Sequence, residues 1–77
     1  MQQGDSDRIG EVAAAIVRHL AANPAASDNA AGIQSWWLGD TLASSAEVSA
    51  ALERLVSLGS VQRIRNPAGD VFRARRA

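Results

Sequence analysis

The side chains best suited to chemistry in this chain of 77 residues are its arginines, because the residue types that most catalysis and metal binding require are scarce. There is no cysteine, which excludes disulfides and thiolate metal sites. The single histidine, His19, would leave a zinc site dependent on carboxylates. Nothing places His19 near Ser44 or Ser45, so these serines are better explained as helix caps than as nucleophiles. The sequence therefore predicts a binding protein with no catalytic residues, metal or cofactor.

Arginine guanidinium groups bind phosphates and carboxylates, and here they are concentrated towards the C-terminal end. The formal net charge is zero, yet residues 54–77 hold six of the eight basic residues and a single acidic one, Asp70. This asymmetry predicts that the C-terminal part faces an anion or an acidic partner. A solvated strand face that balances an acidic helix face explains the same asymmetry.

Two helices are expected before the arginine-rich part. An apolar stripe at helical spacing predicts a first helix over about 7–22, capped by Asp5 or Ser6, with residues 1–5 flexible. A proline that follows Asn23 ends it. A second cluster of capping residues, Ser27-Asp28-Asn29, predicts a short helix over about 29–37, which Gly39-Asp40 breaks.

The third helix is the best marked. Ser44 and Glu47 form a capping box, in which each side chain bonds to the backbone N–H of the other residue. An apolar stripe then runs to Leu58, and Gly59 stands where a left-handed C-terminal cap is expected. The predicted helix spans about 45–58.

In the remaining residues apolar and polar side chains alternate with a period of two, which is typical of strands. Residues 61–65 and 71–75 predict two strands, and the turn-rich segment 66–70 predicts the loop of a hairpin. Ile64, Phe72 and Ala74 are expected to share the inner face. The predicted outward side chains are those of Arg63, Arg65, Arg73 and Arg75.

Because the chain has few large apolar residues, we expect them to form one core. We expect it to contain Ile16, Leu20, Ile33, Trp36, Leu52, Leu55, Ile64 and Phe72. Neighbouring residues on a helix diverge by about 100°, so one of the two adjacent tryptophans is expected at the surface. Trp37 is the predicted partner-binding residue, since exposed tryptophans are common anchors of interfaces and can also help form a dimer.

The order of helix, short helix, capped helix and hairpin resembles the winged helix-turn-helix plan. Residues 45–61 also resemble the recognition-helix segment of winged-helix bacterial regulators, and the likeness extends over about 27–75. The positions that carry it are Val48, Ala51, Leu52, Leu55, Gly59, Val61, Arg63, Gly69 and Asp70. The resemblance implies a single α+β domain over 1–77, mainly α, with three helices and a two-stranded wing.

The resemblance also implies a DNA-binding regulator of transcription, dimeric on two half-sites, with the third helix in the major groove and the arginine wing on the backbone. The residues expected to contact DNA are Ser44, Ser45, Ser49, Ala50, Arg54, Arg63, Arg65, Arg73 and Arg75. Absence of an apolar run long enough to span a bilayer predicts a cytoplasmic protein.

Three features depart from this pattern and keep an alternative open. The outer N-terminal positions of the third helix lack the Arg, Lys, Asn and Gln side chains that read bases best. Glu53 would repel phosphate, and neutral net charge is unusual for a DNA-binding domain. The alternative is a protein-interaction adaptor that uses Trp37 or the arginine wing. A weaker one is an accessory domain of a larger protein.

Overall fold

The structure is a computed structural model that describes residues 3–39 and 41–75, with side chains from residue 8 onward. Its longest element is helix α1 (Gln3–Ala22). It ends as predicted: both N–H groups of Asn23, backbone and side chain, donate to the His19 carbonyl (2.8 and 3.1 Å). The predicted start was wrong. Because α1 begins at Gln3, Asp5 and Ser6 lie within the helix and not at its N-cap. Of the residues expected to be flexible, 1–2 lie outside the described part of the chain.

The second helix has two parts without a break between them. Asn29 is the N-cap of α2 (Ala30–Gly32), and its side-chain oxygen accepts a hydrogen bond from the Gly32 N–H (2.8 Å). The chain then continues as a π-helix, η1 (Ile33–Trp37). The predicted short helix is therefore present, but most of it is not an α-helix. Such π turns are rare and often stand at functional sites.

Helix α3 (Ser45–Leu58) agrees with the prediction at both ends. Ser44 and Glu47 form the capping box, and Gly59 adopts the left-handed conformation (φ 80°) that favours glycine. The buried face of α3 consists of Val48, Ala51, Leu52 and Leu55. This face packs against α1, the neighbour with which α3 makes its most extensive contact.

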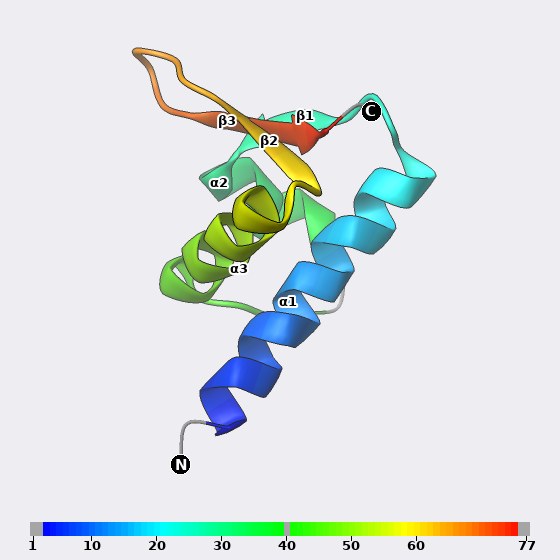
Figure 1. Cartoon of the computed structure of the whole chain (residues 1–77), viewed down its shortest axis with the longest axis vertical. Coiled ribbons are helices and arrows are strands. Elements are labelled where there is room, and N and C mark those ends of the chain that lie inside the picture. Colours follow the sequence, from blue (N-terminus) through cyan, green and yellow to red (C-terminus); the bar gives the residue numbers. More distant parts are fainter. Residues whose placement is uncertain (1–2, 40, 76–77) are drawn as a thin grey trace.

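A three-stranded antiparallel sheet lies across one end of the helices, at the top of Figure 1. Its strands are β1 (Ser27–Asn29), β2 (Val61–Ile64) and β3 (Val71–Ala74), in the order β1-β3-β2. The C-terminal hairpin is the one predicted. The edge strand β1 was missed, because three polar residues give no alternation of apolar and polar positions by which to identify a strand.

A single hydrophobic core joins the helices to the inner face of the sheet. Most residues expected in the core are buried, namely Ile16, Leu20, Ile33, Leu52, Leu55 and Phe72. Two expectations were wrong: Trp36 is 78% exposed and Ile64 is 36% exposed. No helix in the described segments has both the length and the apolar character needed to cross a membrane.

Gly32 lets strand β1 approach helix α2 closely. A Cβ at Gly32 would overlap the carboxylate of Asp28, and that carboxylate accepts a hydrogen bond from the Asn29 N–H (2.8 Å). The backbone of Gly32 is ordinary right-handed helix (φ −66°), so the need for glycine arises from space and not from torsion.

We therefore predict that Gly32→Ala stabilises the domain less than a Gly→Ala change in a helix normally does. Alanine normally stabilises a helix by about 1 kcal/mol over glycine, but here the Asp28 carboxylate must move aside and give up its hydrogen bond to the Asn29 N–H, which should offset most of that gain. Urea unfolding of both proteins measures the difference. In an Asp28→Ala background the same substitution should give the full gain, and equal gains in both backgrounds would contradict the steric explanation.

Candidate functional site

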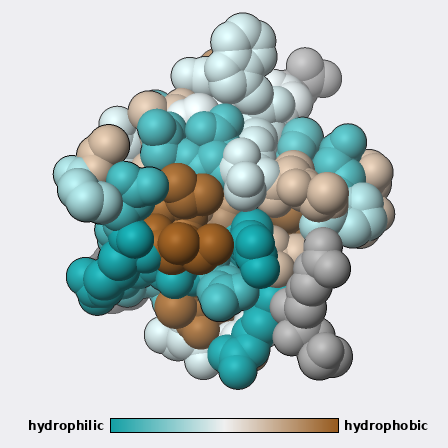
Figure 2. Space-filling model, turned by 90° about the horizontal axis from the view of Figure 1, so that it is seen from above, coloured by the Kyte–Doolittle hydropathy of each residue, from teal (hydrophilic) through white to brown (hydrophobic). Residues whose placement is uncertain are grey.

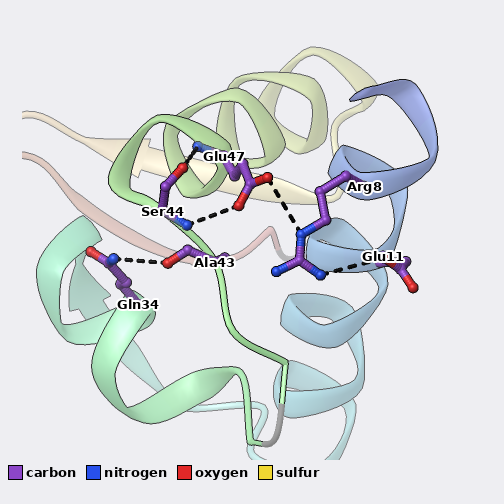
Figure 3. A network of polar contacts seen from close by, with 6 residues as sticks. All are labelled: Arg8, Glu11, Gln34, Ala43, Ser44 and Glu47. Atoms are coloured by element: carbon purple, nitrogen blue, oxygen red, sulfur yellow. Dashed lines mark hydrogen bonds and ion pairs between the residues drawn. The ribbon is translucent and has the colours of Figure 1, made fainter. Parts of the chain in front are cut away.

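A network of polar contacts fixes the start of α3, where the predicted recognition surface begins (Figure 3). The Ser44 hydroxyl accepts from the Glu47 N–H (3.1 Å), and the Ser44 N–H donates to the Glu47 carboxylate (2.9 Å). Arg8 of α1 lies 3.4 Å from the carboxylates of both Glu47 and Glu11. The Ser44 hydroxyl is thus occupied in fixing the N-terminus of α3.

Ser45 also has a partner within the protein. Its hydroxyl donates to the side-chain oxygen of Gln34 on η1 (3.2 Å), and the Gln34 amide donates to the Ala43 carbonyl (2.9 Å). Gln34 therefore joins η1 to the segment that enters α3, as Figure 3 shows. Sequence reasoning missed both Gln34 and Arg8, because pairing between residues far apart in the chain leaves no local pattern.

The exposed face of α3 offers little that could read a base. Ser49 and Ala50 are exposed, as expected of a surface face, and the other exposed residues of this face are Ala46, Glu53 and Ser57. Arg54 is exposed as well, but its guanidinium reaches towards α1, with Nη1 3.9 Å from the position of a Cβ at Gly10. Apart from Glu53, this face of α3 therefore consists of small neutral side chains.

Arg63 is held on the inner side of the hairpin. It forms an ion pair with Glu53 of α3, its Nε lies 3.5 Å from the Asp70 carboxylate, and its guanidinium lies 5.4 Å from the centre of the Phe72 ring. The prediction that Arg63 points outward was wrong. In the observed register Arg63 lies directly opposite Phe72, and residues directly opposite each other in an antiparallel pair point to the same face. Arg63 therefore shares its face with Phe72 and not with Arg73.

The opposite face of the sheet, which we call the outer face, carries two of the other predicted wing residues, Arg73 and Arg75. Arg73 lies opposite Gln62, and Ile64 lies opposite Val71, which is why Ile64 is exposed and is not in the core. The Arg75 N–H donates to the Ser60 carbonyl (3.2 Å), which continues the same pairing and places Arg75 on the face of Arg73. Arg65 is exposed in the loop that follows β2.

The structure exchanges the predicted roles of the two tryptophans. Trp37 is buried (6% exposed) and stacks on His19, with 4.7 Å between the ring centres. It was the predicted docking residue, and that prediction was wrong, because the exposed tryptophan is Trp36. In a π-helix, residues four and five apart share a face, and not residues three and four apart. Ile33 is therefore aligned with Trp37 and Leu38, and Trp36 turns outward.

Side chains that bind metal ions are not brought together in the described part of the chain. No group of three or more His, Asp or Glu side chains there could hold a metal ion. A shallow depression of about 420 Å³ between the end of α1 and the turn after η1 includes Arg18, His19 and Thr41. The described side chains offer two kinds of surface instead, the exposed apolar Trp36 and the basic outer face.

Searches of protein-family models, of curated proteins and of solved structures found nothing similar to this chain.

The capping box gives the protein a specific response to acid. The hydrogen bond from the Ser44 N–H, together with the nearby charge of Arg8, lowers the pKa of Glu47 below its ordinary value, although partial desolvation opposes the shift. A lowered pKa in the folded state adds stability at neutral pH, and this contribution is lost as pH falls through the folded-state pKa.

We predict that the melting temperature falls as pH is lowered below about 4.3, the ordinary pKa of glutamate, and that Glu47→Gln weakens this fall. Glutamine keeps an oxygen that can accept from the Ser44 N–H, but it has no charge to lose. Thermal melts between neutral and acidic pH measure the difference. Identical pH profiles for the two proteins would show that Glu47 is not responsible.

Proposed function

We propose that this chain is a protein-interaction domain of the winged-helix type, and that Trp36 is its principal anchor. The order of three helices and a C-terminal hairpin is consistent with that fold. The proposal corresponds to an adaptor that binds another protein without catalysing a reaction.

The observation that carries the proposal is the exposure of Trp36 on a rigid support. Its side chain is 78% exposed, whereas Ile33, Trp37 and Leu38 around it in sequence are buried. The backbone beneath Trp36 is therefore anchored in the core, so binding would cost little ordering of the main chain. A large aromatic side chain held in this way is typical of the residues that dominate interface energies. Leu42, in the segment between η1 and α3, is exposed as well.

The placement of the arginines supports a protein partner over duplex DNA. Arg73 and Arg75 lie on the outer face of the sheet, whereas α3 packs on its inner side. A duplex that received α3 in its major groove would thus be on the other side of the sheet from these two cations. Arg63, the wing arginine nearest to α3, is already paired with Glu53.

DNA binding is the second candidate, and one observation favours it. The small exposed residues of α3 would allow close approach to a groove, and the ion pair with Arg63 offsets the charge of Glu53. In that case Arg65, in the hairpin loop, is the wing arginine best placed to meet a phosphate.

The test of the anchor is the substitution Trp36→Ser, compared with wild type in affinity capture from the source organism, followed by quantitative mass spectrometry. We expect at least one protein to be retained by wild type and reduced by about thirtyfold with Trp36→Ser, the effect of losing about 2 kcal/mol. Leu58→Ser is the matched control, because Leu58 is also a largely exposed apolar residue but lies at the end of α3.

Both variants should melt like wild type, since neither residue belongs to the core. Titration of random duplex DNA at about 20 and about 150 mM salt separates the two candidates, because DNA binding would weaken steeply between these concentrations. Salt-dependent DNA binding, together with no protein whose capture depends on Trp36, would overturn the proposal.

A further inference from the structure

We infer that the outer face of the sheet is a second docking surface, and that it binds an acidic amphipathic segment of a partner protein. This inference builds on the proposed function, since it specifies a class of partner, but it concerns a surface made by different residues from Trp36.

The centre of this face is apolar. Ile64 and Val71 lie directly opposite each other on β2 and β3, where cross-strand side chains on one face are in contact. Ile64 is 36% exposed and Val71 is partly exposed, although both belong to regular strands. Seen from above, on the side of the sheet, the molecule displays a strongly hydrophobic cluster bordered by hydrophilic residues (Figure 2).

The charge beside this apolar centre is positive. Arg73 on β3 and Arg75, just after it, lie on the same face as Val71, and residues two apart on an extended chain are about 7 Å apart. Neither forms an ion pair with any described side chain. The nearby acidic residues lie elsewhere: Asp28 is paired with Phe72 and so belongs to the inner face, and Asp70 lies beside Arg63.

The remaining positions of the outer face are neutral. Ser27 and Asn29 of β1 lie beside Arg73 and Val71, and Gln62 of β2 lies opposite Arg73. The described residues therefore form a surface with an apolar pair at one end and two unneutralised cations at the other. The surface is basic because the sheet places the nearby acidic side chains on its inner face and these two arginines on its outer face.

These two features together specify the occupant. An apolar side chain of the partner would lie on Ile64 and Val71, and carboxylates nearby would bond to the guanidinium groups of Arg73 and Arg75, which match carboxylate geometry bidentately. A nucleic-acid backbone would meet the two cations but gain nothing from the apolar pair. An acidic amphipathic segment uses both parts of the surface.

The experiment uses the full chain and a synthetic peptide of about 15 residues, four helical turns, with leucine and glutamate at positions that make one apolar face with acidic borders. Amide chemical shifts of the labelled protein are followed during titration. We expect saturable changes confined to residues of the outer face, foremost Ile64, Val71 and Arg73. A peptide with lysine in place of each glutamate should cause none.

Variants test whether the named residues are responsible. Arg73→Glu should weaken binding of the acidic peptide by about tenfold or more, because a cation that meets carboxylates becomes a repulsive anion. Ile64→Ser should weaken binding of the peptide as well. Arg18→Glu is the matched control, because Arg18 is also an exposed arginine but lies on α1, and it should have a much smaller effect. Arg75→Glu gives an independent measure should Arg73→Glu disturb the strand.

Two results would overturn the inference. Equal effects of Arg18→Glu and Arg73→Glu would mean that the peptide senses overall charge and not this face. Tighter binding of a short DNA duplex than of the peptide at the same residues would make the face a surface for polyanions. Neither result affects the capture experiment with Trp36→Ser, which tests the proposed function. Failure of that capture experiment would likewise not affect the peptide titration, so the two proposals can fail separately.

Discussion

The pairing register between β2 and β3 is the constraint on which most of the surface depends. Phe72 must face the helices, because it is the only aromatic side chain of the sheet and is buried in the core. Its partner across the ladder, Arg63, is thereby turned to the same side. A guanidinium at the border of a core requires partners, and Glu53 and Asp70 supply them. The same register turns Arg73 away from the helices, so one pairing determines the surroundings of every arginine in the hairpin strands.

Sequence reasoning succeeded wherever the determining interaction is local. Both ends of α3 were predicted to the residue, since a capping box and a terminal glycine act within one turn of the helix. Two strands and their loop were also predicted, because alternation and turn residues are local signals. The face of each arginine was not predictable, because it depends on which residue of β2 meets which residue of β3. Alternation within one strand does not contain that information.

The tryptophan pair illustrates a different limit. Ile33, Trp36 and Trp37 have the spacing of an α-helical stripe, on which Trp36 would share a face with Ile33. The chain adopts a π turn instead, which aligns Ile33 with Trp37 and turns Trp36 to solvent. Side-chain pairing supports this arrangement, since Trp37 stacks on His19 of α1 and Gln34 bonds to the segment before α3. Contacts between separate elements thus accompany the π turn, and the sequence of this segment alone does not reveal them.

The strand order has a consequence for how the protein is made. Strand β3 follows β1 and β2 in the chain, yet it lies between them and pairs with both. While the ribosome is still translating the hairpin loop, β1 and β2 have no neighbour to bond with, and the helices lack Phe72 as a cover. Closing the sheet then joins segments more than 40 residues apart, β1 and β3, in one late step. A nascent chain would thus expose its apolar faces to chaperones until β3 has left the exit tunnel.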